Sequence, residues 1–171
     1  EFLKGNTRIS YTYDTVSGTG SVIYNENSRI ALITAAHVVN RPDTLLTYYY
    51  DDKAEDQNHI YSVSIKQGQK NLAPDFPSGG RLIMLSSNED HDIALLGSKF
   101  TETPEEPILK IPFPLGRAGE LKWGSFVYLI GYPKGFQMIS RGLVSPSTNE
   151  YRDRYLVDAA FNRGMSGGLV L

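Results

Sequence analysis

The chain has 171 residues, 40% of them hydrophobic, which is enough for one compact domain with a buried core. Its 17 basic and 19 acidic residues are scattered and leave a formal net charge of −2, which excludes the basic patch of a protein that binds nucleic acid or anionic lipid. The absence of cysteine removes disulfides and thiolate chemistry, and no apolar run approaches the roughly 18 residues that cross a membrane. We therefore expect a globular domain with no membrane insertion and no nucleic-acid partner.

Short strands separated by turn residues make up most of the sequence. Nine runs rich in β-branched or aromatic residues are bounded by Gly, Pro, Asn, Asp or Ser. In chain order, the runs are GSVIYN, IALIT, TLLTYYY, IYSVSI, RLIMLS, DIALL, SFVYLIGY, QMISRGLVS and RYLVDAAF. No segment keeps a helical period through several turns, and this spacing favours antiparallel barrels or sandwiches. The predicted fold class is all-β.

A proline-rich stretch interrupts the series of strands. The segment TETPEEPILKIPFPLG, residues 101–116, carries four of the nine prolines. Proline cannot donate a hydrogen bond to a sheet, and it stiffens an extended path. We therefore predict a linker over approximately residues 101–120, between a first half at 1–100 and a second half at 121–171.

The C-terminal stretch FNRGMSGGLVL places Ser166 among three glycines. The letters GMSGG satisfy the G-x-S-x-G pattern of the α/β-hydrolase nucleophile, but that mechanism needs a histidine after the serine. His37, His59 and His91 all precede Ser166. The order histidine, aspartate, serine is the one that remains available.

One histidine and one aspartate have informative surroundings. The stretch ITAAHVV places His37 on a turn of small residues just after a predicted strand. The stretch HDIALL places Asp92 at the head of an apolar strand, where a carboxylate can be buried against an imidazole. Both stretches suit the positioning of a catalytic pair.

Six stretches resemble, in order, the motifs of the chymotrypsin-fold serine peptidases, and in finer detail those of the bacterial HtrA or Deg branch. They are GTGSVI, TAAHVV, DIALL, GSFVYLIGYPKG, RGLVS and DAAFNRGMSGG. The resemblance covers residues 18–171 and is weaker between 40 and 90. It implies a single peptidase domain over 1–171, built from two antiparallel β-barrels, that acts on protein or peptide substrates without a cofactor.

The resemblance implies a role for each site residue. His37 is the general base that takes the proton of Ser166 and returns one to the leaving amine. Asp92 fixes the imidazole tautomer and stabilises the imidazolium, although Asp90 and Glu89 lie close in sequence. The N–H groups of Gly164 and Ser166 are expected to hold the oxyanion.

Two further positions depart from well-known relatives. Ala160 stands six residues before Ser166, where the family has the floor of its primary pocket, and it offers no charge. We therefore expect cleavage after small or medium apolar residues. Met165 replaces the acidic residue that trypsin-like zymogens use for activation, so activation by that salt bridge is not expected. His59 and His91 receive no role, and no ligand spacing predicts a metal site.

The end of the sequence and the protein's setting are expectations from the same resemblance. In the family, two more strands follow the serine segment, so we expect the natural chain to continue past Leu171 and the second barrel here to be incomplete. The resemblance favours an exported bacterial protein, and the oligomeric state stays open. Two alternatives to a peptidase remain: an inactive, protease-like binding or sensory module, and an esterase that uses the same triad.

Overall fold

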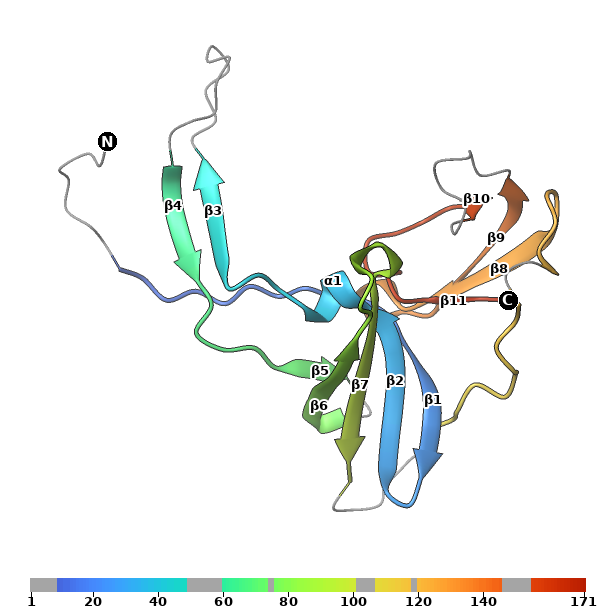
Figure 1. Cartoon of the computed structure of the whole chain (residues 1–171), viewed down its shortest axis with the longest axis horizontal. Helices are drawn as coiled ribbons and strands as arrows, with labels where there is room; N and C mark the ends of the chain where they lie inside the picture. Colours follow the sequence, from blue (N-terminus) through green and yellow to red (C-terminus); the bar gives the residue numbers. More distant parts are fainter. Residues whose placement is uncertain (1–8, 49–59, 74–75, 101–106, 118–119, 146–154) are drawn as a thin grey trace, which may run out of the picture.

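The computed structural model describes residues 9–48, 60–73, 76–100, 107–117, 120–145 and 155–171. Two antiparallel sheets form its body (Figure 1). The first has the order β1-β2-β7-β6-β5, and the second has the order β10-β9-β8-β11. The one α-helix of the described residues, α1 (Ala36–Val39), is four residues long. The predicted all-β class is therefore confirmed.

The first sheet is curled into a half-barrel (Figure 1). Its strands are β1 (Gly20–Glu26), β2 (Arg29–Ala35), β5 (Asn71–Ala73), β6 (Phe76–Leu85) and β7 (Ile93–Lys99). Alternate residues of β2 and β7 point inward because successive side chains of a strand face opposite sides. They form one core cluster with the last residue of α1, made of Ile30, Leu32, Val39, Ala94 and Leu96.

The pairing of β2 with β7 brings the end of β2 next to the start of β7. Ala35, the last residue of β2, lies opposite Ile93, the first residue of β7. The residues that follow Ala35 and precede Ile93 must therefore lie side by side. His37 and Asp92 are in these two segments.

The second sheet carries the segment that contains Ser166. Its strands are β8 (Phe126–Gly131), β9 (Met138–Ser145), β10 (Leu156–Asp158) and β11 (Leu169–Val170). Val127, Leu129 and Val144 of this sheet pack with Met165 in a second core cluster. Met165 thus ties the serine-containing loop to the sheet.

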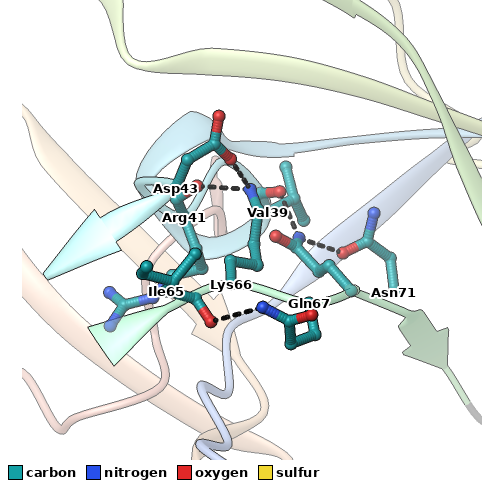
Figure 2. Close-up of polar contacts among 8 residues, drawn as sticks. Val39, Arg41, Asp43, Ile65, Lys66, Gln67 and Asn71 are labelled. Atoms are coloured by element: carbon teal, nitrogen blue, oxygen red, sulfur yellow. Dashed lines mark hydrogen bonds and ion pairs between the residues drawn. The ribbon is translucent and has the colours of Figure 1, made fainter. Parts of the chain in front are cut away.

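A hairpin of β3 (Thr44–Tyr48) and β4 (Ile60–Ile65) extends away from the two sheets (Figure 1). A polar network fixes its base to the segment after α1 (Figure 2). Lys66 Nζ donates to the Arg41 carbonyl and pairs with Asp43, both at 2.8 Å. Gln69 donates to the Val39 carbonyl. The end of α1 is therefore held by a hydrogen bond from Gln69 as well as by the packing of Val39 in the core.

All nine predicted runs overlap strands, although parts of TLLTYYY and RYLVDAAF lie outside the described residues. The structure adds β5 and β11, which are only three and two residues long. No strand occurs in the described part of the predicted linker, residues 107–117 and 120. That part lies beside β1, because the Ile111 N–H donates to the Val22 carbonyl at 2.8 Å.

Candidate active site

His37 and Asp92 form the centre of the site. The Asp92 carbonyl accepts the Ala36 N–H at 2.9 Å, and Asp92 Oδ1 accepts the His37 N–H at 2.8 Å. Asp92 Oδ2 lies 2.6 Å from His37 Nδ1. Asp92 therefore fixes the backbone of Ala36 and both the backbone and the ring of His37.

The backbone of Asp92 is unusual. Its φ of +47° is in the left-handed region, which aspartate tolerates better than most residues. Asp92 follows the short 3-10 turn η1 (Glu89–His91), so the chain reverses here before β7 begins. This conformation lets the same residue present its carboxylate and its carbonyl to the α1 turn. Such backbone strain is common at functional sites.

The charge state of the pair follows from these contacts. Burial opposes ionisation of Asp92, but the hydrogen bonds from the His37 ring and backbone, the charge of His37 and the Ala36 N–H together outweigh it. The pKa of Asp92 is therefore lowered from its ordinary value of 3.8. An ionised carboxylate only accepts hydrogen bonds, so His37 Nδ1 must carry the proton. In the neutral imidazole, His37 Nε2 can then accept a proton from a nucleophile.

Ser166 lies on a loop that packs against the strand leading to His37. The Ser166 carbonyl accepts the Thr19 N–H at 2.7 Å. A Cβ added at Gly167 would lie 2.8 Å from the backbone nitrogen of Ala35, two residues before His37. In the described part of the chain, the Ser166 hydroxyl makes no hydrogen bond to the His37 ring. Catalytic hydrogen bonds are often long without substrate and tighten when it binds.

The backbone around Gly164 provides the predicted oxyanion donors. Gly164 is buried and has a φ of +101°, a conformation in which any other residue would be strained. Its carbonyl accepts a hydrogen bond from Thr19 Oγ1 at 2.9 Å. No hydrogen bond within the described residues uses the N–H groups of Gly164 and Ser166. Neither predicted donor is therefore used by the backbone of the described residues.

Met165 has a structural role that the sequence did not reveal. Its side chain is only 7% exposed and packs against Val127, Leu129 and Val144. Its Sδ accepts the Asn162 N–H at 3.4 Å. A carboxylate at this position would be buried without a charged partner in that cluster, which is costly. The apolar residue beside Ser166 anchors the loop instead of pairing with a charge.

Two hollows flank the site. One, of about 130 Å³, lies beside the Ser166 loop and is lined mainly by apolar side chains, from Leu129, Ile130, Phe161, Met165, Leu169 and Val170, and by Gly167 and Gly168. The other, of about 370 Å³, lies against the His37–Asp92 pair and is also lined by Ala36, Asn40, Leu85, Ser86, Asn88 and Ile93. Ala160, the predicted pocket floor, is exposed and lines neither hollow.

The other two histidines of the sequence are assigned no role. His59 lies outside the described residues, and His91 Nε2 is 3.3 Å from Asn88 Nδ2. Nowhere in the described ranges do three or more His, Asp or Glu side chains gather as metal ligands would. No helix among the residues that the structure describes could cross a membrane.

Comparison with known proteins places this geometry in a family. The model of the trypsin-like peptidase domain matches residues 18–171. The chain belongs to this family. The chymotrypsin-type fold that the sequence motifs implied is thereby confirmed, and members of a peptidase family act on proteins or peptides. No curated protein matches the sequence significantly.

One solved structure supports the same fold at low sequence identity, and a second is similar to a smaller degree. The crystal structure of Deg5 aligns with a TM-score of 0.50 and 20% identity, over 90% of this chain and 68% of Deg5. The Rv3671c protease in an inactive form aligns with a TM-score of 0.44 and 22% identity, over 90% of this chain and 65% of that protein. The trypsin-like domain described here thus spans about two thirds of each of these solved chains.

Proposed function

We propose that the protein is a serine endopeptidase in which His37, Asp92 and Ser166 form the catalytic triad. The observation that carries the proposal is the His37–Asp92 pair, which leaves Nε2 free, in a trypsin-like peptidase domain. The Ser166 loop packs against the end of β2, two residues before His37. The resemblance of six sequence motifs to the HtrA or Deg branch supports the same assignment, in agreement with the fold of Deg5.

The chemistry follows from the charge state of the pair. Ser166 Oγ attacks the carbonyl carbon of the scissile bond while its proton moves to His37 Nε2. The ionised Asp92 stabilises the imidazolium that results. As the tetrahedral intermediate collapses, the C–N bond breaks and His37 gives the proton to the leaving amine. Water then hydrolyses the acyl-enzyme by the same route and restores Ser166.

The oxyanion formed in each step is held by backbone donors. The N–H groups of Gly164 and Ser166 have no other partner among the described residues and are close in sequence to the attacking hydroxyl. Each such donor typically lowers the barrier by about 3 to 4 kcal/mol. The left-handed Gly164 lets the chain present these donors on one side of the loop.

The substrate is a protein or peptide with an apolar residue before the scissile bond. The hollow beside the Ser166 loop is lined mainly by apolar side chains. A small or medium apolar side chain fits such surroundings better than a charged one, because a buried unpaired charge is costly.

The test is turnover of denatured casein by the full-length protein and its variants. Ser166→Ala is expected to reduce kcat by a factor on the order of 10³ or more without changing the fold. Ser98→Ala, on β7, is the matched control and should keep wild-type activity. Wild-type activity in Ser166→Ala would contradict the proposal. Hydrolysis of simple esters but not of casein would favour an esterase, and no turnover of either by the wild type would favour a binding module.

A further inference from the structure

Thr19 is the residue at which the first sheet, the second sheet and the Ser166 loop meet. It directly precedes β1 and is only 4% exposed. Its main chain donates to the Ser166 carbonyl at 2.7 Å and accepts from Thr34 Oγ1 at 2.6 Å. Its hydroxyl donates to the Gly164 carbonyl at 2.9 Å and accepts the Tyr132 N–H at 2.8 Å. All its polar groups are therefore engaged.

These bonds act on the residues that supply the oxyanion donors. The N–H groups of Gly164 and Ser166, the predicted oxyanion donors, have no partner among the described residues, and Thr19 holds the carbonyl of each residue. Fixing these two carbonyls fixes the peptide planes 164–165 and 166–167, because each peptide unit is planar. The Ser166 N–H belongs to the peptide between these two planes, and the Gly164 N–H belongs to the peptide just before the first. The orientation of both donors therefore depends on the two peptides that Thr19 holds.

The same residue connects this loop to the general base. Thr34 is 6% exposed, lies on β2 three residues before His37, and pairs with Ala94 of β7. Its hydroxyl holds the Thr19 carbonyl. A continuous set of hydrogen bonds therefore runs from Gly164 and Ser166, through Thr19, to β2, the strand that ends two residues before His37.

The surroundings of Thr19 are closely packed. A Cβ added at Gly131 would lie 3.2 Å from Thr19 Oγ1, and one added at Gly167 would collide with the Thr19 carbonyl. Removing the hydroxyl would leave the Gly164 carbonyl and the Tyr132 N–H without this partner in a closely packed place. Unpaired buried groups are costly, so the loop would turn to find other partners.

We propose that Thr19 is a positioning residue for peptide hydrolysis, which orients the Gly164–Ser166 backbone relative to His37. The inference rests on the proposed function, since it assigns Thr19 to the same site. Thr19 touches no reacting atom; it acts through the two residues whose carbonyls it holds. Because oxyanion donors act mainly in the transition state, losing their orientation lowers kcat and leaves KM almost unchanged.

The experiment compares Thr19→Val, which keeps the shape but removes the hydroxyl, with Thr19→Ser, which keeps the hydroxyl. In full-length protein, Thr19→Val is expected to lower kcat on a peptide substrate by about 10- to 100-fold with KM within about twofold. Thr19→Ser should restore kcat to within about threefold of wild type. Ser140→Ala, which removes another buried hydroxyl, on β9, is the control and should leave kcat unchanged.

A second measurement does not depend on activity. Hydrogen–deuterium exchange of peptides that cover residues 162–171 should become faster in Thr19→Val, while exchange in β8 and β9 stays the same. If Thr19→Val does not fold, Thr34→Val carries the test, because it removes only the bond to the Thr19 carbonyl and should cause a smaller fall in kcat.

The outcomes separate this inference from the proposed function. A folded Thr19→Val with wild-type kcat and unchanged exchange would overturn the positioning role, and so would equal losses in Thr19→Val and Ser140→Ala. Wild-type activity in Ser166→Ala would instead overturn the serine peptidase. The exchange measurement would still show whether Thr19 holds the loop.

Discussion

Gly167→Ala tests how closely the Ser166 loop packs against the first sheet. Gly167 has a φ of +83°, in the left-handed region. A Cβ at this position would collide with the Thr19 carbonyl oxygen and with Thr34 Oγ1, and would lie 2.8 Å from the backbone nitrogen of Ala35. Two of these are backbone atoms and cannot move without shifting β2 or the start of β1.

The expected loss of stability has two parts. Placing alanine in the left-handed conformation costs about 1 to 2 kcal/mol. Forcing a methyl group into a closely packed place costs about 1 to 3 kcal/mol more. The sum is roughly 2 to 5 kcal/mol in the free energy of unfolding. For a domain of this size, that lowers Tm by roughly 5 to 15 °C.

The chain offers a matched control. Gly135, at the end of the turn η3 (Pro133–Gly135), has a φ of +82° but nothing within 4 Å of an added Cβ. Gly135→Ala therefore places alanine in the left-handed conformation without a collision. It should lower the free energy of unfolding by only about 1 to 2 kcal/mol. Urea denaturation followed by tryptophan fluorescence and circular dichroism measures both variants against the wild type.

The stability losses of the two variants together test how closely the Ser166 loop packs against the first sheet. If Gly167→Ala loses no more stability than Gly135→Ala, the close approach of the Ser166 loop to Thr19, Thr34 and Ala35 is wrong. A large loss in Gly167→Ala, together with a small one in Gly135→Ala, would support it. Activity should fall with stability only in Gly167→Ala, because Gly167 directly follows Ser166.

Two further predictions concern the anchors of the site. Met165→Ala should lower the free energy of unfolding by about 2 to 5 kcal/mol in urea denaturation, because it empties part of the second core cluster. A loss below about 1 kcal/mol would contradict the role of Met165 as the anchor of the Ser166 loop. The pKa of Asp92 is lower in the folded protein than its ordinary 3.8, so its contribution to stability is present above that value and is lost as the pH falls through the folded pKa. The stability difference between wild type and Asp92→Asn should therefore be larger at pH 7 than at pH 3, and an equal or larger difference at pH 3 would oppose this reasoning.

The sequence predicted the strands better than it predicted how they associate. Alternating β-branched and apolar residues identified the nine runs, because a half-buried strand needs that pattern. The strands β5 and β11 are too short to show any period. The pattern of β3 and β4 predicts strands but not their neighbours, so their separation from the two sheets could not be foreseen.

The site was predicted in part. His37 and Asp92 stood at strand ends that the β2–β7 register brings together, and the two side chains are hydrogen-bonded, but they are 56% and 44% exposed and not buried as expected. Thr19 was missed because a threonine between two glycines is typical of any turn. Its partners Gly164 and Tyr132 lie 145 and 113 residues further along the chain, and no local pattern encodes such contacts. The glycines on both sides of Thr19 were the only signal of close packing there.

The most direct test of the peptidase site is covalent labelling of the full-length protein with an organofluorophosphonate, followed by mapping of the modified residue by mass spectrometry. If His37, Asp92 and Ser166 form the catalytic triad, one adduct is expected, on Ser166. It should disappear in Ser166→Ala and be strongly reduced in His37→Ala. Labelling that is unaffected by both substitutions, or that maps to another residue, would contradict the triad.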